Sequence, residues 1–304
     1  MKLIFLGTPT FAVATLEQCV KAGHTVQAVY TQPDRPKGRG QQLAFPPVKE
    51  AALRLGLPIH QPERIRRPEV VEELKAFAPD VMVVVGYGQM IPQVILDIPP
   101  QGIINVHASL LPKYRGAAPI QWAIARGETV TGVTTMKINA GLDTGDMLGK
   151  WQTPIGAEEN ALELGPRLAE AGARLLVETL RDLDRIIPEP QSEADATLAP
   201  ILKKEDGHID WTLSAREIHN RIRGFLPWPG GYAFLRGARF GIWKAQVADR
   251  SIAQGHLLAE KGLLYVGCGT GALELIEIQA EGKKRMEPRA FLNGFALQEE
   301  ETLS

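Results

Sequence analysis

The chain has 304 residues, 44% of them hydrophobic and 23% charged, which is typical of a globular protein and excludes a fibrous or disordered chain. The formal net charge is −1 and no run of 18 apolar residues occurs, so neither a bulk polyanion binder nor a membrane-spanning protein is expected. Two cysteines are too few for a disulfide framework or a zinc site, and no secretory segment is expected, so the chain is predicted to be cytoplasmic.

The first two hundred residues alternate short apolar runs with amphipathic stretches. Strands are predicted at 3–6, 26–30, 81–85, 103–106 and 133–138, and helices at 12–22, 47–55, 68–77 and 119–125. The run VMVVV at 81–85 does not alternate, which is typical of a strand buried on both faces of a parallel sheet. This order predicts an α/β fold with a doubly wound, mostly parallel, Rossmann-like sheet that binds ligands beyond the carboxyl ends of its strands.

A longer helix is predicted from 158 to about 185, and a stretch rich in Pro, Ser and Ala follows it. We interpret 188–204 as a linker between a catalytic domain, 1–187, and a C-terminal domain, 205–304. The second domain opens with a capping box at Ser214 and continues with short strand-like pieces separated by glycines. This pattern predicts a small OB-like β-barrel.

The turns after the first two predicted strands differ in what they can bind. Only Gly7 matches the three glycines of a dinucleotide-binding fingerprint, so a nicotinamide cofactor is disfavoured. The loop 31–47 carries Arg35, Lys37 and Arg39 against one acidic residue. A loop of this length is usually functional or mobile, although a solvated surface loop is the simpler interpretation when it is considered alone.

The segment IINVHASLLPKYRG carries the densest group of polar side chains. Asn105 and His107 share one side of a predicted strand, because side chains repeat every two residues. Asp143 follows the next strand between glycines, where an Asx turn is the simpler interpretation and a calcium loop would need more ligands. An amide can donate to an oxyanion while imidazole and carboxylate transfer protons, which predicts group transfer without a metal. Lys113 and Arg115 are expected to be solvated or to face an anion.

NVHASLLPKYRG resembles the signature of the folate-dependent formyltransferases. The segments FLGTPTFA, TQPDRPKGRG, VMVVVGYG, GLDTGDML, HIDWTLSA and PWPGGYAFL resemble those members of the family that act on methionyl-tRNA, so the similarity spans essentially the whole chain. The family often has a glycine where this chain has Ala108, so a positive φ is not expected at that position.

This resemblance implies transfer of a formyl group from 10-formyltetrahydrofolate to the α-amine of initiator methionyl-tRNA, by a monomeric enzyme without a metal. It assigns catalysis to Asn105, His107 and Asp143. It assigns folate contacts to two turns, Ser109, Leu110, Leu111 and Pro112 on one side and Gly86, Tyr87 and Gly88 on the other. A cis Leu111–Pro112 bond is expected, because the turn must reverse the chain tightly behind His107.

The resemblance also implies that Arg35, Lys37 and Arg39 reach the acceptor end of the tRNA. Between residues 203 and 298 there are 14 basic and 10 acidic residues, and the basic run Lys283, Lys284 and Arg285 lies among them, so a second RNA contact is predicted there. Two alternatives remain. A formyltransferase for glycinamide ribonucleotide or an aminosugar nucleotide would not need the basic loop and the C-terminal domain. A non-enzymatic RNA-binding protein would not need the intact trio.

Overall fold

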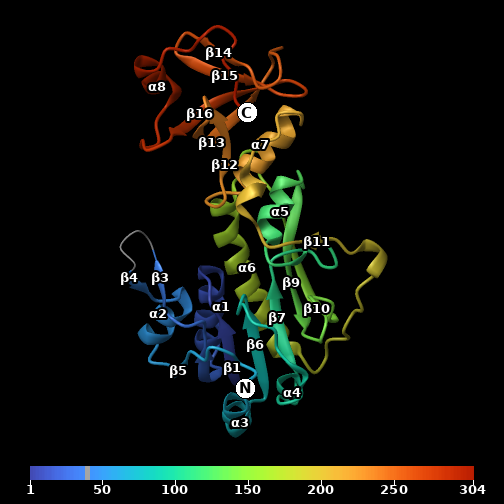
Figure 1. The fold of residues 1–304 in the computed structure, drawn as a ribbon. Helices are drawn as coiled ribbons and strands as arrows, with labels where there is room; N and C mark the ends of the chain where they lie inside the picture. The colour runs from blue at the N-terminus through green and yellow to red at the C-terminus, as the bar shows by residue number, and fades with distance from the viewer. Residues whose placement is uncertain (38–41) are drawn as a thin grey trace. The chain divides into compact units, whose positions relative to one another are not determined.

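The computed structural model describes residues 1–37 and 42–304, which form two compact units (Figure 1). The first unit comprises Met1–Ala117, Thr131–Thr153 and Gly165–Ala199. The second comprises Ala118–Val130, Pro154–Leu164 and Pro200–Ser304. Each unit has its own hydrophobic core.

A seven-stranded sheet with the strand order β10-β9-β7-β6-β1-β2-β5 forms the centre of the first unit. Its strands are β1 (Lys2–Gly7), β2 (Thr25–Tyr30), β5 (Ile59–His60), β6 (Val81–Val85), β7 (Ile103–His107), β9 (Val130–Lys137) and β10 (Met147–Pro154). The strands from β5 to β7 are parallel, and β9 runs antiparallel to β7. The predicted mostly parallel sheet is therefore confirmed, while β5 and β10 were not predicted because neither contains an apolar run.

Helices cover both faces of this sheet. One face packs against α1 (Thr10–Lys21), α2 (Pro47–Arg54) and α6 (Ala161–Asp182), and the other against α3 (Pro68–Ala76) and α4 (Gln93–Leu96). In β6, Val83 belongs to the core on the first face and Met82 to the core on the second. This double burial explains why the strand shows no hydrophobic alternation.

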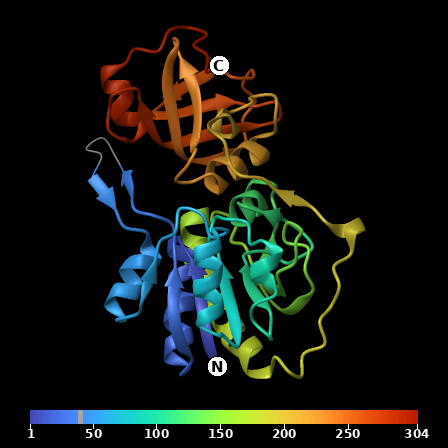
Figure 2. The ribbon, with the colours of Figure 1, turned by 60° about the horizontal axis from the view of Figure 1, so that its bottom comes forward.

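Besides the large sheet, the first unit contains two small pairs of strands. The strands β3 (Arg35–Lys37) and β4 (Gln42–Ala44) form an antiparallel pair. Residues 189–199, which we call the strap, include the 3₁₀ turn η1 (Glu193–Asp195) and the strand β11 (Leu198–Ala199), which pairs in parallel with β8 (Arg115–Gly116). The strap is the yellow segment along the outside of the first unit in Figure 2. Its composition predicts a linker, yet backbone hydrogen bonds tie it to the first unit at both ends.

The second unit contains an antiparallel five-stranded sheet with the order β12-β13-β16-β15-β14. Its strands are β12 (Gly231–Leu235), β13 (Ala238–Ala248), β14 (Leu257–Glu260), β15 (Leu263–Gly267) and β16 (Ala272–Ala280). The helical elements are α5 (Pro119–Ala125), the 3₁₀ turn η2 (Lys204–Gly207), α7 (Ala215–Gly224) and α8 (Pro288–Gly294). The predicted capping box is confirmed, since Ser214 and Glu217 exchange hydrogen bonds at the start of α7.

The closed OB-like barrel is not confirmed. Within the described residues, β12 and β14 stand at opposite ends of the strand order and do not pair with each other. The last residues of the chain run between them, because Phe234 and Ser304 exchange backbone hydrogen bonds at 2.7 and 3.0 Å while the Leu257 N–H donates to the Glu301 carbonyl at 2.8 Å. In the part of the chain that the structure describes, no helix is both long and apolar enough to cross a membrane.

Candidate active site

Asn105 and His107 lie at the carboxyl end of β7, two residues apart and therefore on one side of the strand. Both are buried, with exposed fractions of 8% and 5%. Among the described residues, none is hydrogen-bonded to the Asn105 side chain. A nearly buried amide without a protein partner is available to a ligand, because buried polar groups otherwise find partners.

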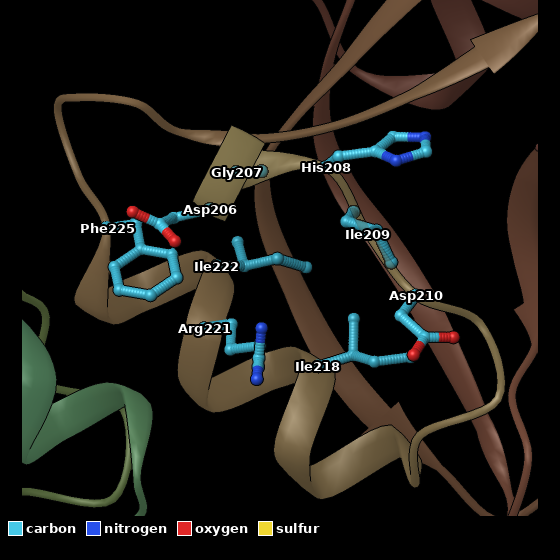
Figure 3. Close-up of a pocket in the computed structure, with 10 residues that line it drawn as sticks. Asp206, Gly207, His208, Ile209, Asp210, Ile218, Arg221, Ile222 and Phe225 are labelled. Carbon is cyan, nitrogen blue, oxygen red and sulfur yellow. The ribbon is translucent and has the colours of Figure 1, made fainter. Parts of the chain in front are cut away.

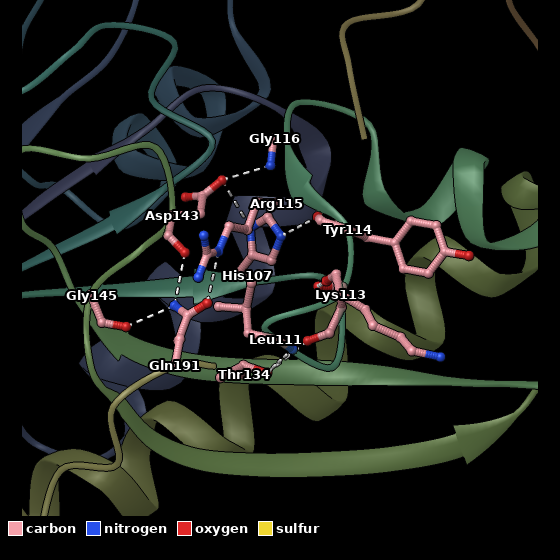
Figure 4. A network of polar contacts seen from close by, with 11 residues as sticks. His107, Leu111, Lys113, Tyr114, Arg115, Gly116, Thr134, Asp143, Gly145 and Gln191 are labelled. Atoms are coloured by element: carbon pink, nitrogen blue, oxygen red, sulfur yellow. Dashed lines mark hydrogen bonds and ion pairs between the residues drawn. The ribbon is translucent and has the colours of Figure 1, made fainter. Parts of the chain in front are cut away.

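The His107 ring is held from two sides (Figure 4). Its Nε2 lies 2.8 Å from the Tyr114 carbonyl oxygen. A carbonyl only accepts, so Nε2 carries a hydrogen and donates it. The other ring nitrogen, Nδ1, lies 3.7 Å from Asp143 Oδ2, which is longer than a hydrogen bond. Nδ1 is therefore the nitrogen that can exchange a proton with a bound substrate.

The Asp143 carboxylate is fixed by backbone. Its Oδ2 accepts a hydrogen bond from the Gly116 N–H at 2.8 Å. Asp143 has a φ of +50° and Tyr114 has a φ of +63°, both in the left-handed region that non-glycine residues rarely adopt. The two residues that contact the His107 ring thus both have strained backbones, a feature that clusters at active sites.

The turn 109–112 comes shortly after His107 and is held by several hydrogen bonds. The buried Ser109 hydroxyl donates to the Lys113 carbonyl at 2.6 Å. Thr134 Oγ1 accepts from the Leu111 N–H at 3.1 Å and donates to the Ser109 carbonyl at 2.7 Å. The Leu111–Pro112 bond is cis, as predicted. Ala108 is absent from the described non-glycine residues that have a positive φ, as expected.

The turn residues that are predicted to contact folate differ in how exposed their side chains are. The Leu111 side chain is buried in a cluster with Met136 and Met147. Leu110 and Pro112 remain partly exposed, and so can contact a ligand with side chains as well as backbone.

The predicted turn Gly86–Gly88 follows β6 and presents backbone. Gly86 and Gly88 have φ values of +58° and +84°. The Tyr87 side chain is buried, and this burial raises the pKa of its phenol. The Tyr87 carbonyl accepts hydrogen bonds from Thr8 Oγ1 and Gln32 Nε2, both at 3.0 Å, so residues after β1 and β2 hold the turn in place.

The predicted RNA-binding residues fall in different units. Arg35 is exposed at the start of β3, Lys37 ends that strand, and Arg39 lies outside the described residues. In the second unit Lys283, Lys284 and Arg285 are all exposed. Of these three, the Arg285 guanidinium lies over an aromatic ring, 3.3 Å from the ring centroid of Trp243.

Sequence reasoning missed the side chains that support the site. Of the two alternatives expected for Arg115, solvation is wrong, since it is only 4% exposed, while it does face an anion, the carboxylate of Glu193, which was not predicted as its partner. Gln191 in the strap reaches the Asp143 turn. No local pattern signals these contacts, because each joins segments that are distant in sequence.

Both cysteines are free and buried. Burial raises the pKa of both Cys19 and Cys268 to about 12, so neither thiol is ionised at neutral pH.

The second unit has a small hollow, and none of the site residues described above lines it (Figure 3). It is lined by η2, the residues after it and α7, with His208, Asp210 and Arg221 among its side chains. Its volume of about 10 Å³ is roughly the space that one water molecule requires. It cannot hold a folate.

We compared the chain with models of protein families and with known proteins. Residues 1–180 match the model of the formyl transferase family, and residues 201–296 match the model of the formyl transferase C-terminal domain. The chain is 60% identical to a methionyl-tRNA formyltransferase of Solibacter usitatus, covering 100% of this chain and 98% of that one. It is also 60% identical to a methionyl-tRNA formyltransferase of Koribacter versatilis, covering 97% and 96%.

The fold is similar to that of an N-formyltransferase from Helicobacter canadensis, solved in complex with folinic acid and dTDP-3-aminofucose. The TM-score is 0.67 at 18% identity, covering 92% of this chain and 99% of that one. The chain therefore belongs to the formyl transferase family, among the methionyl-tRNA formyltransferases.

Proposed function

We propose that this chain transfers the formyl group of 10-formyltetrahydrofolate to the α-amine of initiator methionyl-tRNA, for the start of translation. The observation that carries the proposal is the 60% identity to methionyl-tRNA formyltransferases over the whole chain, second unit included. The folate donor is supported by the Helicobacter canadensis neighbour, since folinic acid is itself a formylated tetrahydrofolate.

Asn105 stabilises the charge that develops on the formyl oxygen. When the neutral amine attacks the formyl carbon, that oxygen becomes an oxyanion, and the Asn105 amide can donate a hydrogen bond to it. Among the described residues the amide has no hydrogen-bond partner to give up, so its hydrogen bond is available for the transition state.

His107 and Asp143 manage the protons. The attacking nitrogen must lose a proton, and the folate nitrogen N10 must gain one to leave. Because Nε2 is committed to the Tyr114 carbonyl, Nδ1 exchanges these protons, and the Asp143 carboxylate beside it stabilises the ring when it is charged.

The folate is held by two backbone turns, Ser109–Pro112 and Gly86–Gly88. Ser109 acts mainly through the shape of the turn, because its hydroxyl is committed to the Lys113 carbonyl. Glycines at 86 and 88 leave backbone exposed for close approach by a flat ring.

The tRNA is bound by Arg35, Lys37 and Arg39 in the first unit and by Lys283, Lys284 and Arg285 in the second. Within the second unit, residues 203–298 carry 14 basic and 10 acidic residues, a local basic excess of the kind that favours nucleic-acid binding. We propose that it is an OB-like barrel whose remaining gap is filled by the terminal residues between β12 and β14, since these residues hydrogen-bond to both sides.

The domain limits 1–187, 188–204 and 205–304 stay a prediction, as do the monomeric state and the cytoplasmic location. The matched family models, 1–180 and 201–296, support a division near residue 190. Residues 118–130 and 154–164 also group with the second unit.

A panel of amine acceptors tests the proposed function. The purified chain is incubated with 10-formyltetrahydrofolate and, in turn, methionyl initiator tRNA, methionyl elongator tRNA, glycinamide ribonucleotide and an aminosugar nucleotide. We expect formylation of the initiator tRNA only. Formylation of a small amine in preference to the tRNA would instead support the alternative acceptor.

A further inference from the structure

The turn that carries Asp143 joins β9 to β10 without regular secondary structure, yet it must hold a carboxylate in a fixed place. Two carbonyl oxygens of this turn, those of Asp143 and Gly145, accept hydrogen bonds from one donor (Figure 4). That donor is the side-chain amide of Gln191, whose Nε2 lies 2.8 and 2.7 Å from them. The two hydrogens of the amide are thus used on the two carbonyls.

The orientation of the Gln191 amide is fixed by its other end. Its Oε1 accepts a hydrogen bond from Arg115 Nε at 2.9 Å. An arginine can only donate and a carbonyl can only accept, so exchanging the amide oxygen and nitrogen would break all three contacts. Gln191 therefore holds the turn in one arrangement.

Arg115 is itself immobilised. Its side chain is 5% exposed, and its two terminal nitrogens donate to the two oxygens of Glu193 at 2.9 and 2.8 Å. The hydrogen bond from Arg115 also lowers the pKa of the Glu193 carboxyl, so the partner stays charged near neutral pH. A planar guanidinium held by two parallel bonds has little freedom to rotate.

Three consecutive residues connect these contacts to the His107–Asp143 pair. The Tyr114 carbonyl accepts from His107, the Arg115 side chain donates to Gln191, and the Gly116 N–H donates to Asp143. Both members of the pair are thus fixed relative to one tripeptide. In this arrangement Asp143 Oδ2 lies 3.7 Å from His107 Nδ1, a distance longer than a direct hydrogen bond.

We propose that Gln191 is a positioning residue of the formyl transfer: oriented by Arg115, it holds the turn that places the Asp143 carboxylate beside His107. The inference rests on the proposed function, because it assigns Gln191 a role in that reaction. Gln191 acts through Asp143 and needs no contact with either substrate. Misplacing a reacting group by about 1 Å can cost on the order of 100-fold in rate.

Gln191→Glu tests this role with nearly unchanged shape. The new carboxylate can still pair with Arg115 but cannot donate to the Asp143 and Gly145 carbonyls. We expect kcat for formylation of methionyl initiator tRNA to fall about 10- to 100-fold, with KM for both substrates changed less than about threefold. Gln191→Met removes the same donor without adding a charge, and should give the same loss if Gln191→Glu fails to fold. The matched control is Gln101→Glu, which loses one donated bond to Asp184 at the other end of β7 and should keep wild-type kcat.

A double-mutant cycle separates positioning from a general structural role. If Gln191 acts only through Asp143, the variant Asp143→Asn with Gln191→Glu should be no slower than Asp143→Asn alone. Multiplicative losses, or a wild-type kcat in both Gln191 variants, would overturn the proposal. An inactive wild type would count against the proposed function instead, so the two failures are distinguishable.

Discussion

The two ring nitrogens of His107 have different surroundings. Nε2 lies 2.8 Å from the Tyr114 carbonyl oxygen, and Nδ1 lies 3.7 Å from the Asp143 carboxylate. That Asn105 shares its side of the strand could be predicted from the sequence, because alternation depends only on spacing. The contacts of Tyr114 and Gln191 could not, because they depend on how distant segments fold against β7.

Thr134 offers a test of the folate turn at the level of one hydroxyl. Thr134→Val keeps the shape but leaves the buried Leu111 N–H and Ser109 carbonyl without their partner, at a cost of about 1–3 kcal/mol for each group. We expect a lower melting temperature and a raised KM for 10-formyltetrahydrofolate.

The control for this substitution is Thr15→Val. The Thr15 hydroxyl is equally buried and is without a hydrogen-bond partner among the described residues. Its loss should leave stability unchanged or raise it. Equal melting temperatures for the two variants would contradict the role assigned to Thr134.

The strap is the element whose composition says least about its contacts. A segment rich in Pro, Ser and Ala is typical of a linker, yet Gln191, Glu193 and Thr197 all contact the 114–116 segment or the Asp143 turn. Polar residues give the same local signal whether their partners are protein or water. The parallel pairing of β11 with β8 could not be predicted from the sequence either, because each strand has only two residues.

Gly116 tests the importance of this pairing. Its φ is +123°, and a Cβ added there would lie 2.5 Å from the Ala199 carbonyl. Gly116→Ala should cost about 1–3 kcal/mol in backbone strain alone and should lower kcat, because the Gly116 N–H holds Asp143. Gly165→Ala is the control, since the added methyl meets nothing within 4 Å in helix α6, and up to about 1 kcal/mol of stabilisation is expected. Wild-type melting temperature and kcat for Gly116→Ala would show that the pairing is dispensable.

For the whole molecule, the alternation of strands and helices was enough to predict the sheet of the first unit. The predicted barrel was not confirmed, because β12 and β14 do not pair within the described residues, and the terminal residues between them show no strand pattern in the sequence. The stability of the second unit also carries a pH dependence that composition does not reveal. Burial lowers the pKa of His219 below its ordinary value of 6.5, and this effect outweighs the attraction of Glu158 at 3.0 Å.

This pKa predicts that stability falls in mild acid. Below about pH 6.5 the unfolded chain binds a proton at His219 that the folded chain does not, so stability decreases as the pH falls toward the lower folded pKa. When the pH is lowered from about 7.5 to about 5.5, the melting temperature of the wild type should fall by more than that of the His219→Leu variant. Parallel pH curves for the two proteins would rule this out.

The basic run at Lys283, Lys284 and Arg285 predicts a salt-sensitive tRNA interaction. Lys283→Gln with Lys284→Gln should raise KM for the charged tRNA, leave KM for 10-formyltetrahydrofolate unchanged, and reduce the salt dependence by up to about 0.9 in log–log slope per lost contact. Lys21→Gln with Lys75→Gln removes the same charge from the first unit and should change neither KM. A similar effect from both pairs would mean that net charge, rather than this basic run, determines tRNA binding.

Single-turnover formylation of methionyl initiator tRNA, with both substrates saturating, tests the catalytic trio most directly. The account predicts rapid transfer by the wild type and loss of most of the rate in Asn105→Ala, His107→Ala and Asp143→Ala. Asn105→Ala, which removes the oxyanion donor, should be about 100- to 1000-fold slower while folate and tRNA still bind. A wild-type rate in the Asn105→Ala enzyme would contradict the account, because the buried amide near the end of β7 would then have no part in the reaction.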